Sequence, residues 1–148
     1  MLAVSAVDEV RAANAAFYAA FEARDDSAMG AVWEHSERVS VTHPGWPTLI
    51  GWARVARSWE AIFANTPFIQ FVLTEERVLV ADGMALVTLD ENILQAAGPT
   101  AREGDDAAAL SGSRVAATNA FAHDTGRWRM VHHHGSPVSA AFDRGLTE

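Results

Sequence analysis

The feature that most constrains this chain is a change of hydrophobic period at Pro67. Beyond it, apolar and polar residues alternate over four long stretches, which predicts β-strands at 68–80, 84–95, 113–122 and 127–134. Asp82-Gly83 and residues 124–126 predict tight hairpin turns, and residues 97–112 predict a long exposed loop between antiparallel strands.

The residues before this change predict three helices and one short strand. Ser5 is a suitable cap for the first helix, and residues 24–27 end it and offer a cap for a short second one. Residues 39–42 are rich in β-branched side chains and predict a strand, after which Gly51 begins the third helix. Helices followed by a run of antiparallel strands indicate an α+β fold, with the helices covering one face of a curved sheet.

Composition sets outer limits on partners and chemistry. The 148 residues suit one domain, 1–148, with a single core. The net charge is -8 and all 11 cationic residues are scattered arginines, so we expect no nucleic-acid partner. The absence of lysine and cysteine excludes Schiff-base and thiolate chemistry. The N-terminus lacks the pattern of a signal peptide, and no apolar run reaches membrane-spanning length, so we expect a cytoplasmic protein without membrane contact.

Four local patterns together resemble one family. They are Phe17-x-x-x-Phe21-x-x-x-Asp25, a strand that ends in His43-Pro44-Gly45, the Gly51 helix that carries Trp59, and the final Trp128 to Ser136 segment. In this order they resemble the SnoaL-like, or NTF2-like, superfamily, which includes ketosteroid isomerase. The resemblance implies a cone, in which a strongly bent antiparallel or mixed sheet wraps around the N-terminal helices and leaves a pocket at its open end. It also implies a homodimer that pairs through the outer face of the sheet.

The resemblance makes His43 the first catalytic candidate. The isomerases place an acidic general base at the end of the corresponding strand, and an imidazole can do the same work near neutral pH. A structural histidine in the turn before Pro44 is the alternative. The isomerase pattern departs at its tyrosine, whose position falls on Phe17, with Tyr18 one residue further around the helix. Steroid isomerisation is therefore not expected.

Counting in twos along the strands suggests which polar residues accompany His43. Asp90 shares a face with Thr88 and Asn92, and His134 shares one with His132. If these faces point into the cone, Asp90 and His134 converge with Asn119 and assist catalysis. The alternative is that they face solvent or a dimer partner, because a bulge would invert the count.

Two further groups complete the expected site. In the run His132-His133-His134, the two same-face imidazoles of His132 and His134 could ligate a metal together with His43, but a hydrogen-bonding network explains the run more simply, so we expect no metal and no cofactor. The side chains expected to bind a ligand are Tyr18, Trp33, Trp46, Asn119 and His132.

These features support two functional interpretations. The first is an acid/base enzyme of the isomerase, cyclase or hydratase type, which acts on a small, mostly apolar molecule with His43 as base. The second is a non-catalytic ligand-binding or dimeric assembly module, in which the same residues bind a ligand or stabilise the dimer. The fold cannot decide between them, because one fold carries many unrelated functions.

Overall fold

The computed structural model describes residues 4–96 and 110–141. Within them the elements are α1 (Ala6–Ala23), α2 (Asp26–Val32), β1 (Ser40–Thr42), β2 (Leu49–Ile50), α3 (Trp52–Ala64), β3 (Ile69–Ala81), β4 (Met84–Gln95), β5 (Ser111–Asp124) and β6 (Arg127–Pro137). The predicted order of helices and long strands is confirmed, and only the short β2 was not predicted. Most of the predicted loop 97–112 lies outside the described residues, and its last two residues belong to β5.

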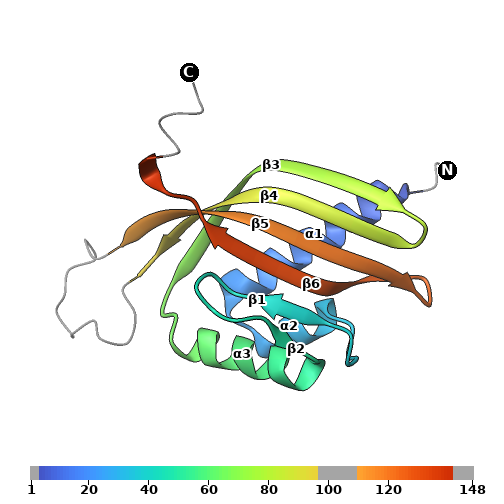
Figure 1. The fold of residues 1–148 in the computed structure, drawn as a ribbon, viewed down its shortest axis with the longest axis horizontal. Coiled ribbons are helices and arrows are strands. Elements are labelled where there is room, and N and C mark those ends of the chain that lie inside the picture. Colours follow the sequence, from blue (N-terminus) through green and yellow to red (C-terminus); the bar gives the residue numbers. More distant parts are fainter. Residues whose placement is uncertain (1–3, 97–109, 142–148) are drawn as a thin grey trace.

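The strands form one curved sheet that wraps around α1, as Figure 1 shows. Their order is β2-β1-β6-β5-β4-β3. Strands β3 to β6 are antiparallel neighbours, whereas β1 runs parallel to β6, so the sheet is mixed. The α+β fold with a curved mixed sheet is thus confirmed. We call the face of the sheet toward α1 the inner face and the opposite one the outer face.

Local sequence signals determine where the first two helices begin. The Ser5 hydroxyl accepts a hydrogen bond from the backbone N–H of Asp8 at 3.1 Å, and the Asp25 carboxylate caps α2 through the N–H of Ala28 at 3.0 Å. Because the sheet curves around α1, more than one stripe of this helix is buried. Its buried residues are Val10, Asn14, Phe17, Tyr18 and Ala20.

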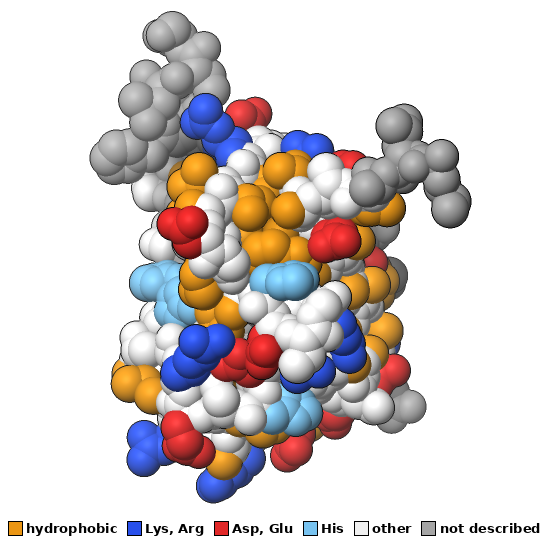
Figure 2. All heavy atoms as spheres, turned by 90° about the vertical axis from the view of Figure 1, so that its right-hand side faces the viewer, with side chains coloured by type: hydrophobic (Ala, Val, Ile, Leu, Met, Phe, Trp, Pro, Cys, Tyr) orange, Lys and Arg blue, Asp and Glu red, His pale blue; other side chains and the backbone are white. Residues whose placement is uncertain are grey.

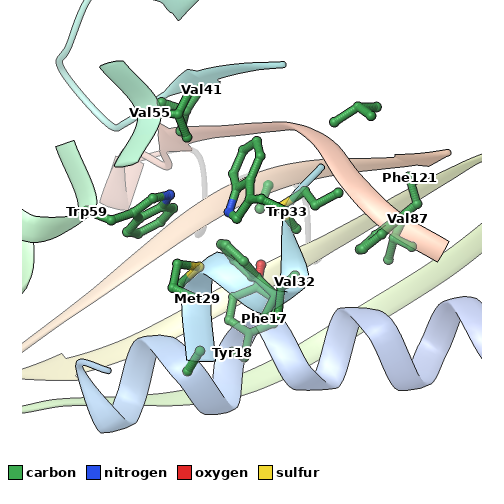
Figure 3. Close-up of a cluster of buried hydrophobic side chains, with 14 of the residues drawn as sticks. Phe17, Tyr18, Met29, Val32, Trp33, Val41, Val55, Trp59, Val87 and Phe121 are labelled. Carbon is green, nitrogen blue, oxygen red and sulfur yellow. The ribbon is translucent and has the colours of Figure 1, made fainter. Parts of the chain in front are cut away.

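The core between α1 and the sheet is rich in aromatic side chains, several of which are drawn in Figure 3. Phe17 contacts Trp59 edge-on at a centroid distance of 5.5 Å, and Phe21 contacts Phe71 in the same way at 4.7 Å. Trp33 and Trp59 are fully buried. Such edge-to-face pairs contribute about 0.5–1.5 kcal/mol each beyond the apolar area that they bury.

A β-bulge in β6 changes which side chains face inward. Phe121 pairs with Met130 while its neighbour Ala120 pairs with His132, so Val131 is an extra residue on β6. Met130 and Val131 are both buried, and the alternation is inverted beyond them. His133 therefore lies on the inner face, and its two neighbours lie on the outer face.

The molecular surface carries mixed charge. Figure 2 shows basic, acidic and apolar side chains interspersed on the face that contains the hairpin tips, with no single basic area on that face. Among residues 4–96 and 110–141, no helix is both long enough and apolar enough to span a membrane.

Candidate active site

A cavity of about 280 Å³ is lined by residues at the ends of several strands. These strand ends lie at the left-hand side of Figure 1. The turn after β1, the end of α3, and β3 to β6 all contribute to the wall of the cavity. Its polar lining comes from His43, Thr66, Glu91, Gln95, Ser113 and His133. The remaining lining side chains are apolar: Phe21, Pro44, Trp46, Ile62, Ile69, Ile93, Val115 and Pro137. A cavity of this size suits a molecule of one or two small rings, because benzene already fits in about 150 Å³.

His43 is buried in the wall at the end of β1. Its Nε2 lies 2.9 Å from Ser58 Oγ, and the Ser58 hydroxyl donates its one hydrogen to the Val55 carbonyl at 2.6 Å. Ser58 must therefore accept from His43, so Nε2 carries the hydrogen and the lone pair remains on Nδ1. Burial lowers the pKa of His43 to about 4, which keeps the ring neutral at pH 7.

Glu91 on β4 is the second buried ionisable group of the cavity. The Tyr18 hydroxyl donates to Glu91 Oε2 at 2.5 Å. Burial raises the pKa of Glu91 to about 7, against a smaller lowering by this hydrogen bond. Burial and the nearby charge of Glu91 also raise the pKa of the Tyr18 phenol, so the phenol stays protonated. Glu91 therefore exists in both protonation states near neutral pH.

A buried amide connects these groups to His133. Asn119 Nδ2 donates to the Tyr18 hydroxyl at 3.2 Å, and Asn119 Oδ1 lies 2.6 Å from His133 Nδ1. Burial, followed by electrostatic repulsion from the protonated form of His43, lowers the pKa of His133 well below its usual value. Like His43, His133 is neutral at pH 7. The cavity thus combines two neutral imidazoles with one carboxyl group.

Two predicted catalytic residues lie on the other side of the sheet. Asp90 is on the outer face, where its carboxylate pairs with Arg114 at 2.7 Å. His134 is exposed and lies opposite Thr118 on the same face. Both line a separate polar hollow of about 530 Å³. The expectation that Asp90 and His134 converge with Asn119 inside the cone is therefore wrong.

The predicted ligand-binding residues are placed in three ways. Trp46 lines the cavity and is 41% exposed. Tyr18 and Asn119 are buried behind the lining, where they contact Glu91 and His133. Trp33 and His132 were placed wrongly: Trp33 lies in the core and beside a different hollow near α2, and His132 bonds Ser40 on the outer side of β6.

The structure gives no metal centre within the described residues, where no three or more His, Asp or Glu side chains lie close enough to hold an ion. His132 and His134 share the outer face, whereas His43 is in the cavity, so the predicted alternative of a shared metal does not match their placement.

Sequence reasoning missed Glu91 and gave His133 no role. Glu91 shares a face with Val87 and Leu89, which are both buried, but the apolar Met84 and Leu86 on the opposite face made this alternation ambiguous in the sequence. His133 had no such signal, because its orientation depends on the bulge at Val131.

Comparison with known proteins agrees with the fold. The model of the SnoaL-like domain matches residues 10–140. A crystal structure of a candidate dehydratase from the NTF2-like family of Streptomyces avermitilis is 41% identical, with a TM-score of 0.81 over 90% of this chain and 97% of that one.

Two further relatives carry other names. A candidate calcium/calmodulin-dependent protein kinase type II association domain from Thiobacillus denitrificans is 32% identical, with a TM-score of 0.72 over 87% of this chain and 94% of that one. The F-box protein SKIP8 of Arabidopsis thaliana is 28% identical over 123 residues, which are 83% of this chain but only 47% of that protein. With the match to 131 of its 148 residues, this chain belongs to the SnoaL-like family.

Proposed function

We propose that this protein is an acid/base enzyme that acts on a small, uncharged, mostly apolar molecule bound in the cavity. The observation that carries the proposal is that His43 and Glu91 line one cavity with pKa values moved in opposite directions, to about 4 and about 7. Groups whose environments separate their pKa values in this way are suited to act as base and acid. Glu91 takes the assisting role that sequence reasoning gave to Asp90 and His134.

The lone pair on His43 Nδ1 is the proton acceptor in this scheme. In a dehydration, it removes a proton from carbon, and the C–H electron pair becomes the new double bond as the C–O bond breaks. Protonated Glu91 gives its proton to the departing hydroxyl, which leaves as water. Return of the first proton to solvent and reprotonation of Glu91 complete the cycle. Hydration is the reverse of this reaction, and an isomerisation uses the same base and acid.

Two findings favour the enzyme over other functions of the fold. The solved structure at 41% identity bears the name of a candidate dehydratase, a reaction that needs one base and one acid. The Ser58 and Tyr18 hydrogen bonds also hold His43 and Glu91 at fixed positions, as proton transfer requires.

Ring opening of 1,2-benzisoxazole tests the base without knowledge of the natural substrate, because it needs only the loss of one carbon-bound proton. We expect His43→Gln to lower the rate about 100-fold, within the usual range for one general base. His134→Gln, on the outer face, is the matched control and should change the rate less than twofold. Equal rates for His43→Gln and wild type would contradict the proposal.

The second candidate function is an assembly module, favoured by the 32% identity to a candidate kinase association domain.

We propose a cytoplasmic, single-domain homodimer in either case. The outer face carries exposed apolar side chains at Leu79, Met84 and Leu86, which a second copy could cover. Light scattering coupled to size exclusion should give twice the chain mass, and a monomer at all concentrations would refute the dimer.

A further inference from the structure

Side-chain hydrogen bonds link Glu76, Asn14, Asn119 and His133, and only one arrangement of the hydrogens satisfies all of them. The arrangement can be followed inward from Glu76. Glu76 pairs with Arg11 at 3.3 Å, and its ionised carboxylate can only accept hydrogen bonds. Asn14 lies 3.4 Å from that carboxylate, so its Nδ2 must point there and donate. The Asn14 Oδ1 atom is thereby turned toward Asn119, whose Nδ2 donates to it at 2.8 Å.

The orientation of Asn119 then determines the tautomer of His133. With Nδ2 directed at Asn14 and the Tyr18 hydroxyl, the Asn119 Oδ1 atom faces His133 and needs a donor. His133 Nδ1 must therefore carry the hydrogen, and the lone pair remains on Nε2. His133 lines the cavity, and its Nε2 atom is thus fixed as a hydrogen-bond acceptor by a series of contacts that starts at Glu76.

His43 is fixed in the complementary way, with its hydrogen on Nε2 and its lone pair on Nδ1. Glu91 adds a carboxyl group to the same wall. No arginine lines the cavity among the described residues, and the chain has no lysine. An anionic ligand would meet two nitrogen lone pairs and a carboxyl group without a compensating cation.

We propose that the cavity selects uncharged ring-sized molecules that carry O–H or N–H donors, and that it excludes carboxylates and phosphates. This inference rests on the proposed function only in taking the cavity as the substrate site. The substrate must bring hydrogen-bond donors to the two imidazoles. The imidazoles accept its hydrogens, and the apolar side chains cover its ring.

A matched set of one-ring probes tests the ligand class by calorimetry at pH 7.5. We expect 1,3-dihydroxybenzene to bind at least tenfold more tightly than its dimethyl ether, since each lost hydrogen bond costs about 1 kcal/mol. Benzoate should bind at least tenfold more weakly than the diol. Benzoate affinity equal to or above that of the diol would overturn the proposal. Tighter binding of benzylammonium or of one zinc ion per chain would overturn it too, in favour of a cation site.

The tautomers provide a second test that needs no ligand. Long-range proton–nitrogen correlation spectra of histidine-labelled protein distinguish the two neutral forms, and backbone assignment identifies each ring. We expect the Nδ1–H form for His133 and the Nε2–H form for His43, and the reverse for either ring would overturn the proposal. Neither test uses turnover. If the ring-opening assay fails while the preference for the diol is still observed, the proposed enzyme function is contradicted and the proposed ligand class is still supported.

Discussion

The two faces of the sheet carry similar side chains in opposite circumstances. Glu91 and His133 on the inner face are 3% and 2% exposed, and their neighbours Asp90 and His134 lie on the outer face. The inner pair is held by Tyr18 and Asn119, whereas Asp90 forms an ion pair with Arg114. One step along a strand therefore separates a buried carboxyl group whose pKa is raised to about 7 from one in a surface ion pair.

The difference shows that burial, more than residue type, gives these side chains the pKa values that suit them to acid/base catalysis. Removing a carboxylate from water disfavours its charged form, and removing an imidazole from water disfavours its charged form too. The same cavity therefore raises one pKa and lowers the other. Four predictions can break or sharpen this contrast.

The largest effect is expected for Glu91→Gln against Asp90→Asn. If Glu91 supplies the proton to a leaving oxygen, replacing its carboxyl group by the amide of glutamine should lower the rate of a dehydration or isomerisation about 100-fold. The matched change at Asp90 should cost less than twofold. The rates are to be compared on any substrate found from the ligand series. Equal losses at both positions would remove the distinction between the faces.

The next largest effect is on stability, at Asn119. Asn119→Ala removes the hydrogen-bond partner of His133 Nδ1 and one hydrogen bond each of Tyr18 and Asn14, which should lower the free energy of unfolding by about 3 kcal/mol. Thr118→Ala, the adjacent change toward the outer face, should cost about 0.5 kcal/mol or less. Urea denaturation measures both. A loss below about 1 kcal/mol at Asn119 would show that the network is not tightly held.

The pH dependence of stability sharpens the comparison further. The pKa of Glu91 is raised on folding from 4.5 to about 7, so protonated Glu91 stabilises the fold below pH 4.5, and this contribution is lost as pH rises through 7. The unfolding free energy of wild type minus that of Glu91→Gln should fall by up to about 3 kcal/mol between pH 4.5 and 8. His43 changes the pH dependence of the unfolding free energy in the opposite direction. Its contribution is the same in both proteins and cancels in the difference. A constant difference would contradict the raised pKa.

The smallest effect is expected at Trp46, which lines the mouth of the cavity. Because this side chain is 41% exposed, Trp46→Ala should change the unfolding free energy by about 1 kcal/mol or less. It should nevertheless weaken binding of 1,3-dihydroxybenzene several-fold, since the ring wall is lost. Calorimetry with the same probe measures this, and unchanged affinity would place the ligand elsewhere.

The sequence predicted the fold well because its signals were redundant. The order of periodicities, the caps at Ser5 and within residues 24–27, and the hairpin turns all agreed with one α+β arrangement. The position of His43 at the end of β1 followed from the same order. The inward orientation of Asn119 followed from the regular alternation of β5.

The site was predicted less well, for two physical reasons. Strand β4 carries large apolar residues on both faces, such as Leu86 and Leu89, so its pattern did not show which face was buried. In β6, the extra residue Val131 inverted the alternation, and a bulge has no reliable signal in one sequence. Each error exchanged one residue for its neighbour: Asp90 for Glu91, and His134 for His133.

The most direct test of this contrast is the titration of the Glu91 carboxyl carbon by NMR in glutamate-labelled protein. The resonance absent from Glu91→Gln identifies it. We expect a midpoint near pH 7. A midpoint near 4.5, the ordinary value for glutamate, would show that the inner face does not perturb this group, and would contradict the acid role of Glu91.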